Sequence, residues 1–311
     1  MSHSIIQNKK KHLTWIDIMN PNVEDRILIE ELGLFSDSDI ADVFRSTTRT
    51  KVTKHKNYVV MVMMSPVHDT KKKLQRVREI DFLIAKKTIV TVHYHPLKWI
   101  QNMVSACEDP EYNTVFFAGN IEGVLFSILN GMQEQVYPMI DTINTRLDRL
   151  EDELFSTESS RDLVEDIVQT RRDITDMRRA MRSHADVITH LIKRDEYENT
   201  LQIIKRRSLF GSLIDDANEI WGALESNKEI IEALEDANDA LISHGLNDTI
   251  KTLTAVSVIL LPASLLAGLF GVNAKNMPFI GHPADFWIIV YCIVFLCTVL
   301  LIFFWRKGWL K

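Results

Sequence analysis

Two apolar stretches near the C-terminus decide the fold class: residues 253 to 270 read LTAVSVILLPASLLAGLF, and residues 286 to 305 read FWIIVYCIVFLCTVLLIFFW. Neither contains a charged residue, and each approaches the ~20 residues that a helix needs to cross the hydrocarbon core of a bilayer. Aromatic residues stand at both ends of the second stretch, where rings anchor among lipid headgroups. We predict two transmembrane helices, because uncharged runs of this length seldom occur as buried helices of soluble folds.

The charges that flank the spans predict the orientation of the chain. Positive residues stand before the first span and after the second: Lys251, Arg306, Lys307 and Lys311. The loop between the spans, residues 271 to 285, carries Lys275 against Asp285. The first thirty residues contain no uninterrupted apolar run of the kind found in signal peptides. We therefore expect an integral protein of the bacterial plasma (inner) membrane with both termini in the cytoplasm.

Composition excludes several classes of function. The net charge of −6 argues against a general nucleic-acid binder. The three cysteines, Cys107, Cys292 and Cys297, form no CxxC pattern and imply no disulfide framework. The sequence has no Gly-rich phosphate loop, no GxSxG and no HExxH, so we expect neither an enzyme nor an organic cofactor.

The first span carries a stripe of mostly small or polar residues at helical spacing. Its members step by three and four along the chain: Asn247, Ile250, Thr254, Ser257, Leu261, Ser264 and Gly268. Such a face should point away from lipid, whereas the second span has no comparable stripe and is predicted to face lipid. Packing of helix against helix without a pore would also explain small and hydroxylated residues. One such face cannot enclose a pathway, so a pore would require several copies of the chain.

The chain before the membrane is predicted to contain an α/β domain over residues 1 to 120. Residues 12 to 18, 57 to 64 and 80 to 93 have the β-branched and aromatic enrichment of strands. A short helix is expected between Pro21 and Gly33. From Ile121 the pattern changes to long helices over residues 121 to 208.

A stalk helix is predicted over residues 209 to 252. A heptad seam runs through it: Leu213, Ala217, Ile220, Leu224, Asn227, Ile231, Leu234, Asn238 and Leu241. Helices should associate side by side along such a seam. No proline interrupts the pattern between Leu209 and Leu261, so the helix is expected to continue into the span. A solvated coiled-coil seam used only for oligomerisation would show the same pattern.

Acidic residues crowd the stalk, with ten between Asp215 and Asp248 against Lys228 alone. Such crowding is costly without counter-ions, and hard divalent cations bind oxygen ligands. An ordinary solvated helix face is the alternative. A separate hypothesis pairs His93 and His95 on one strand face as zinc or cobalt ligands, although Pro96 suggests that the strand ends there.

The residues after the first span carry a resemblance. Gly271-Val272-Asn273, followed by Met277-Pro278, resembles the GxN signature of the CorA superfamily, usually written GMN with a nearby MP. The tail WRKGWL over residues 305 to 310 and the N-terminal WIDI followed by NP are also similar to the family. The resemblance covers nearly the whole chain, weakly in the soluble part and strongly from about Asn247 onward.

The resemblance implies a homopentamer with a cytosolic α/β funnel, a long stalk helix that continues as the pore helix, and an outer second helix. It places Gly271, Val272 and Asn273 at the outer mouth, where a ring of Asn carboxamides binds a hydrated cation. A ring of neutral carbonyl groups is chemically suited to Mg²⁺, which gives up its water reluctantly.

The resemblance also assigns the cytosolic end of the pore. Asn247 matches a second polar ring, Ile250 and Leu253 fall at the hydrophobic constriction, and Asp236 falls at an acidic pore position. In the family, cytosolic Mg²⁺ favours the closed state. We assign the corresponding regulatory carboxylates here to the stalk: Glu232, Glu235, Asp236 and Asp239.

Two departures from the family pattern affect the ion assignment. Val272 replaces the usual Met, and the loop AKNMPFIGHPADF lacks the acidic residue often found after MP while Lys275 adds a cation. A GVN loop also resembles the ZntB branch, which is associated with zinc transport. Magnesium, with cobalt or nickel accompanying it, is the expected cargo, and zinc is the alternative. A membrane-anchored coiled-coil sensor or scaffold that conducts nothing is the competing class.

Overall fold

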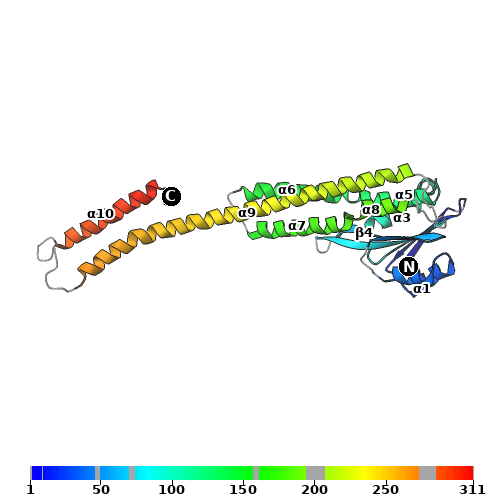
Figure 1. The fold of residues 1–311 in the computed structure, drawn as a ribbon, viewed down its shortest axis with the longest axis horizontal. Coiled ribbons are helices and arrows are strands. Elements are labelled where there is room, and N and C mark those ends of the chain that lie inside the picture. Colours follow the sequence, from blue (N-terminus) through cyan, green and yellow to red (C-terminus); the bar gives the residue numbers. More distant parts are fainter. Residues whose placement is uncertain are drawn as a thin grey trace. The chain divides into compact units, whose positions relative to one another are not determined.

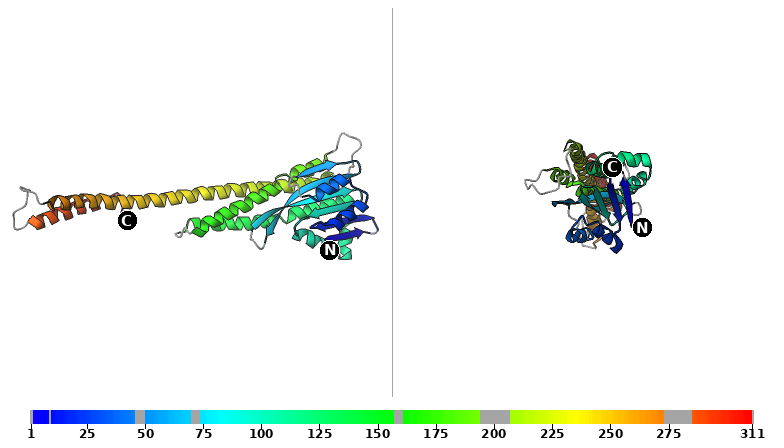
Figure 2. Two further views of the ribbon diagram at one scale, coloured as in Figure 1. Left: turned by 90° about the horizontal axis from the view of Figure 1, so that it is seen from below. Right: turned by 90° about the vertical axis from the view of Figure 1, so that its right-hand side faces the viewer.

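The structure is a computed structural model, and it describes residues 2–8, 10–45, 50–69, 74–156, 161–193, 207–272 and 285–310. The chain divides into two compact units, Met1–Leu234 and Glu235–Lys311. Figures 1 and 2 show the helices and strands of each unit.

A single six-stranded sheet organises the first unit, with strand order β1-β2-β6-β5-β4-β3. The strands are β1 (His3–Asn8), β2 (Leu13–Met19), β3 (Lys51–Lys54), β4 (Tyr58–Asp69), β5 (Leu74–Ala85) and β6 (Thr88–His93). Only the β2–β6 pair is parallel. The stretch predicted as strand over residues 80 to 93 forms two antiparallel strands, because the exposed Lys86 and Lys87 make a tight connection between β5 and β6. The strands predicted over 12–18 and 57–64 match β2 and the first part of β4.

Helices cover both faces of this sheet. The helices of the chain are α1 (Val23–Glu31), α2 (Asp37–Val43), α3 (Lys98–Ala106), α4 (Pro110–Phe116), α5 (Ile121–Glu134), α6 (Tyr137–Leu154), α7 (Arg161–Met181), α8 (His184–Ile192), α9 (Arg207–Phe270) and α10 (Asp285–Arg306). Helix α1 begins at a capping box on Asn22 and is followed by Gly33 at φ +63°, as its start and stop signals predict. Residues of α1 and α2 pack in one apolar core, and residues of α3, α5 and α8 pack in the other.

The heptad seam of α9 packs against helices of its own chain. Figure 1 and Figure 2 show α6 and α7 beside the part of α9 that belongs to the first unit. Gln133 of α5 donates a hydrogen bond to the Leu213 carbonyl at 2.9 Å, and the Arg178 guanidinium of α7 lies 2.6 Å from a Glu225 carboxylate oxygen. The seam positions from Leu213 to Leu234 are buried. The predicted side-by-side association is therefore intramolecular here, and a seam used only for oligomerisation is the wrong interpretation for these positions.

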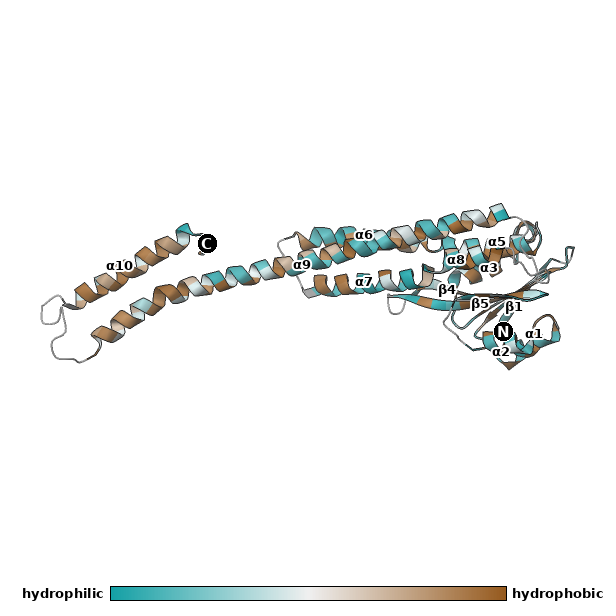
Figure 3. Cartoon of the chain, in the orientation of Figure 1, coloured by the Kyte–Doolittle hydropathy of each residue, from teal (hydrophilic) through white to brown (hydrophobic). Residues whose placement is uncertain are grey.

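The second unit contains the apolar helices. Helix α9 has 64 residues and continues without a break from the predicted stalk into the predicted first span. The apolar end of α9 and helix α10 are the two helices long and apolar enough to cross a membrane among the described residues, and Figure 3 colours both mostly brown, for hydrophobic residues. Helix α4 and the helical residues 121–154 are together also long and apolar enough to span a membrane, but they meet at a bend of 106°. Many of their apolar side chains are buried in the core of the first unit.

Candidate cation pathway

The residues predicted to line a pathway all lie exposed on α9. This set comprises Asn247, Ile250, Leu253, Thr254, Ser257, Leu261, Ser264 and Gly268. Its apolar side chains are more than half exposed, with exposed fractions of 51% for Ile250, 67% for Leu253 and 69% for Leu261. All eight positions are exposed among the described residues, so this face can meet water or other copies of the protein.

Helix α10 covers the opposite side of α9. Ala255 is fully buried, and the Cys297 thiol of α10 lies 4.0 Å from the Ile259 carbonyl. At 3.6 residues per turn, a step of two positions turns the helix by about 200°, so Ala255 and Ile259 lie nearly opposite Ser257. The packing of α10 therefore lies on the side of α9 opposite Ser257.

The stripe presents oxygen acceptors to its surroundings. The Ser257 hydroxyl donates to the Leu253 carbonyl at 2.8 Å, which leaves the lone pairs of its oxygen available. A shallow groove of about 370 Å³ runs along this face, lined by Leu253, Thr254, Ser257, Val258, Leu261 and Pro262. Pro262 has no N–H to donate to the Val258 carbonyl, so that carbonyl lacks its usual helical donor. This acceptor was not predicted from the sequence, although the proline within LLPASL is its signal.

The first two residues of the GVN motif end helix α9. The Gly271 N–H donates to the Ala267 carbonyl at 3.0 Å and to the Gly268 carbonyl at 3.2 Å. A Cβ atom at Gly271 would lie 3.1 Å from the Ala267 oxygen, a tight approach that favours glycine. Val272 is 57% exposed. Asn273 and the remaining predicted loop up to residue 284 lie outside the described residues, so the role of Asn273 stays a prediction.

The four stalk carboxylates assigned to regulation do not form a metal site within one chain. Glu232 pairs with Lys228 at 3.0 Å, and Asp236 and Asp239 are exposed. Across the described ranges, no group of three or more His, Cys, Asp or Glu side chains could hold a metal ion. A regulatory metal site at Glu232, Glu235, Asp236 and Asp239 therefore stays a prediction.

The proposed pair of histidine ligands is wrong. Strand β6 ends at His93, and His95 lies beyond it on exposed chain. The His93 Nδ1–H donates to the His95 backbone carbonyl at 2.6 Å, and His93 Nε2 faces an Asp17 carboxylate oxygen at 3.3 Å. The two rings do not alternate on a common strand face, because the strand ends before Pro96.

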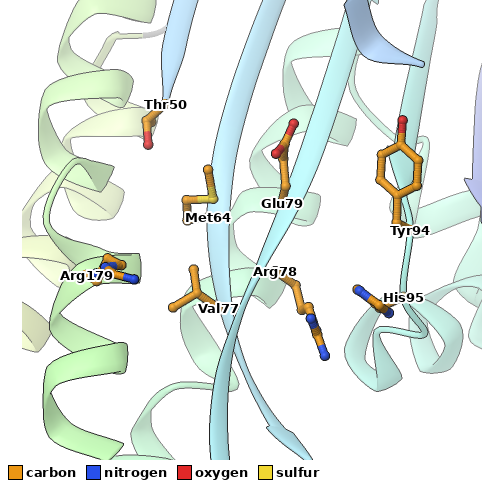
Figure 4. Close-up of a pocket in the computed structure, with 8 residues that line it drawn as sticks. All are labelled: Thr50, Met64, Val77, Arg78, Glu79, Tyr94, His95 and Arg179. Atoms are coloured by element: carbon orange, nitrogen blue, oxygen red, sulfur yellow. The ribbon is translucent and has the colours of Figure 1, made fainter. Parts of the chain in front are cut away.

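A cavity of about 770 Å³ in the first unit is lined by several charged and polar side chains. Figure 4 shows the lining residues: Thr50, Met64, Val77, Arg78, Glu79, Tyr94, His95 and Arg179. Burial and the nearby Arg78 lower the pKa of His95. Burial, followed by the charges of Asp81 and Glu79, raises the pKa of Tyr94 to about 12. Of these residues only His95 was singled out from the sequence, since the set comes from three different elements and two connecting segments.

Asp81 lies two positions after Glu79 on β5 and is 2% exposed. Burial, strengthened by the negative charge of Glu79, raises its pKa to about 8. Its Oδ2 atom is buried without a hydrogen-bond partner. The structure thus favours a protonated Asp81 at neutral pH, because a second buried carboxylate charge beside Glu79 is unfavourable.

We predict that the pH dependence of stability changes in an Asp81→Asn variant. A folded-state pKa above the unfolded value favours folding at low pH, so this contribution is lost as pH rises from about 4 towards 8. The wild-type melting temperature should therefore fall over that range more steeply than that of Asp81→Asn. Thermal melts of the full chain in detergent measure this, with the exposed Asp236→Asn as the matched control. Parallel profiles for all three proteins would contradict a protonated Asp81.

Comparisons with known proteins identify the family. The profile of the family described as CorA-like Mg2+ transporter protein matches residues 10–307. The cobalt/magnesium transport protein CorA of Thermotoga maritima is 20% identical over 308 residues, which cover 96% of this chain and 83% of that protein. The zinc transport protein ZntB of Yersinia enterocolitica is 24% identical over 189 residues, or 59% of this chain and 54% of that protein.

A solved structure shares the fold of the whole chain. The complete structure of the CorA magnesium transporter from Methanocaldococcus jannaschii aligns with a TM-score of 0.84 at 20% identity, covering 98% of this chain and 94% of that chain. It supports the arrangement of an N-terminal α/β domain, a long helix and C-terminal apolar helices. Together with the match over residues 10–307, it shows that this chain is a membrane protein of the CorA family of divalent-cation transporters.

Proposed function

We propose that the chain forms a homopentameric channel that carries hydrated Mg²⁺ into the cytoplasm, with Co²⁺ or Ni²⁺ as accompanying cargo. The observation that carries this proposal is the stripe from Asn247 to Gly268, which is exposed on the side of α9 opposite α10. Polar residues at membrane depth are unfavourable against lipid, so a stripe of this kind favours contact with water or with other helices. Five such stripes around an axis would enclose a polar path.

The chemistry of the stripe suits a cation that keeps its water. Mg²⁺ dehydrates reluctantly and usually retains several waters when it is bound. The Ser257 oxygen and the Val258 carbonyl are neutral acceptors that can receive hydrogen bonds from those waters. Neutral acceptors hold a hydrated ion weakly enough to release it, whereas a carboxylate ring would retain it more strongly. At the outer mouth, Asn273 would supply a ring of carboxamides of the same character.

The direction of transport follows from the flanking charges. Lys251 precedes the first span, and Arg306 and Lys307 follow the second. The positive-inside rule then favours a cytoplasmic location for both the N-terminal domain and the C-terminal tail, in a bacterial inner membrane. The Gly271 end of α9 would lie at the opposite surface.

Zinc is the second candidate cargo, because Val272 replaces Met in the signature and a zinc transport protein is among the relatives. Flux into proteoliposomes separates the candidates. Uptake of Mg²⁺, Co²⁺ and Zn²⁺ is compared with and without a pH gradient. Mg²⁺ uptake without a gradient supports the proposal. If only Zn²⁺ is taken up, and only with a pH gradient, the protein is a zinc transporter and the magnesium proposal is wrong. If no ion is taken up, a non-conducting scaffold is favoured.

Regulation by cytosolic Mg²⁺ gives a further prediction. If five stalks lie side by side, Glu232, Glu235, Asp236 and Asp239 approach their counterparts, and divalent ions should stabilise a closed arrangement against like-charge repulsion. Millimolar Mg²⁺ should then slow proteolysis of the soluble part and inhibit flux. Replacing the four carboxylates by amides should weaken both effects, because the ions must bind one state more tightly than the other to shift the populations.

Limited proteolysis and flux, each titrated with Mg²⁺, measure this prediction. The matched control replaces four acidic residues outside the stalk, Asp148, Glu151, Asp152 and Glu153 of α6, by amides. Protease sensitivity and flux that ignore Mg²⁺ in the unmodified protein would contradict the regulatory proposal, although the pathway proposal would stand.

A further inference from the structure

The cavity of about 770 Å³ in the first unit lies where one edge of strand β5 loses its neighbour. Strand β6 pairs with β5 from Ile80 to Ile84, so the part of β5 before Ile80 pairs only with β4 among the described strands. Val77, Arg78 and Glu79 of that part line the cavity. The cation pathway proposed above uses none of these residues, because it lies on α9.

The Val77 amide faces this open edge of the sheet. The Gln75 N–H donates to an Asp173 carboxylate oxygen of α7 at 2.8 Å, so it points away from β4. Alternate residues of an antiparallel strand direct their backbone groups to the same side, so the Val77 N–H also points away from β4. Pro66, which lies opposite Val77 on β4, fits this arrangement because proline has no N–H to donate across the pair. A sheet edge of this kind can present a backbone donor to an anion.

Two arginines and a histidine add side-chain donors to the cavity. Burial, followed by the charge of Arg78, lowers the pKa of His95, which places these two side chains close together. Arg179 of α7 lines the same cavity. Among the residues that the structure describes, neither arginine forms an ion pair. A guanidinium without a carboxylate partner can bind a phosphate or carboxylate group through two parallel N–H donors.

The other end of the cavity carries hydrogen-bond acceptors. Figure 4 shows the Glu79 carboxylate and the Tyr94 phenol directed to one end, and the basic side chains at the other. The Tyr94 hydroxyl donates to the Val43 carbonyl at 3.2 Å, so its oxygen can still accept a hydrogen bond. The cavity therefore suits a molecule with an anionic group at one end and hydroxyl or amino donors at the other.

We propose that this cavity binds a nucleotide, with its phosphates at Arg78 and Arg179 and its ribose hydroxyls at Glu79. The Val77 amide adds a donor at the phosphate end, and the Met64 side chain adds an apolar contact for the base. The volume lies within the range of about 300–1,000 Å³ that is typical of small-molecule sites. Inorganic phosphate would fill only the basic end, and a nucleoside would leave both arginines without an anion.

Isothermal titration calorimetry of the full chain in detergent, with ADP as the ligand, tests the proposal. EDTA is present, so that ADP cannot bind to the acidic stalk as a magnesium complex. ADP should bind, and Arg78→Gln with Arg179→Gln should weaken its binding about 100-fold, because each lost charge-assisted hydrogen bond costs about tenfold. The matched control is Arg76→Gln with Arg172→Gln, which lie on β5 and α7 but do not line the cavity. This control should bind ADP as the wild type does.

Smaller ligands show whether both ends of the cavity contribute. Adenosine, inorganic phosphate and ribose 5-phosphate are titrated in the same way, and each should bind about tenfold or more weakly than ADP. Arg78→Lys with Arg179→Lys keeps the charges and should recover part of the ADP binding. Thermal melts verify that each variant is folded. The proposal is overturned if ADP does not bind to the wild type, if the double Gln variant binds ADP as the wild type does, if the control variant loses ADP binding equally, or if phosphate alone binds as tightly as ADP.

Discussion

Replacing Asn273 by Ala is expected to reduce Mg²⁺ flux to the level of protein-free liposomes while leaving the oligomer assembled. The proposed function places five Asn273 carboxamides at the outer mouth, where their oxygens receive hydrogen bonds from the waters of the incoming ion. Alanine removes all of these acceptors at once and changes neither apolar span. Dye-based flux into proteoliposomes gives the activity, and size-exclusion chromatography with light scattering gives the assembly state.

Asn276 offers a matched control for this prediction, because it is the same residue type three positions later in the same loop. Asn276→Ala should retain most of the flux, since the resemblance assigns no ion contact to that position. Near wild-type Mg²⁺ uptake by a correctly assembled Asn273→Ala protein would contradict the proposed role of Asn273 in ion binding. An equal loss in both variants would instead indicate that the loop as a whole, and not the Asn273 carboxamide, supports transport.

The second large effect is expected at the proposed constriction. Leu253→Asp or Ile250→Asp should produce a constitutive leak that cytosolic Mg²⁺ does not suppress. A narrow apolar ring blocks ions by excluding water, and a ring of carboxylates would keep it hydrated. Both side chains are more than half exposed on α9, at 67% and 51%, so the substitutions remove little packing among the described residues.

Planar-bilayer conductance at saturating Mg²⁺ measures the leak. Leu253→Met, which keeps an apolar side chain of similar volume, is the control and should remain closed. A closed channel in both Asp variants would place the constriction elsewhere on α9.

The sequence by itself determined the features that depend on local pattern. The sequence predicts α9 as one helix from stalk to span. This prediction rests on an uncharged run of bilayer length, a seam of heptad spacing, and the lack of proline from Leu209 to Leu261. That the stripe residues share one face of α9 was predictable for the same reason, because helical geometry fixes which residues share a face. The GVN motif and its place after the first span carried the resemblance to the family.

Only the tertiary structure determined which partners the side chains contact and how deeply they are buried. The heptad seam of α9 could have packed against another copy of the chain. Only the fold shows that the seam residues from Leu213 to Leu234 pack within the chain. The end of β6 at His93 separated two histidines that alternate in sequence. Nothing in the sequence marks Asp81 as buried, whereas its burial in the sheet, beside the charge of Glu79, raises its pKa to about 8. Periodicity fixes the direction of a side chain on its own element, but burial, pKa and partner depend on elements distant in sequence.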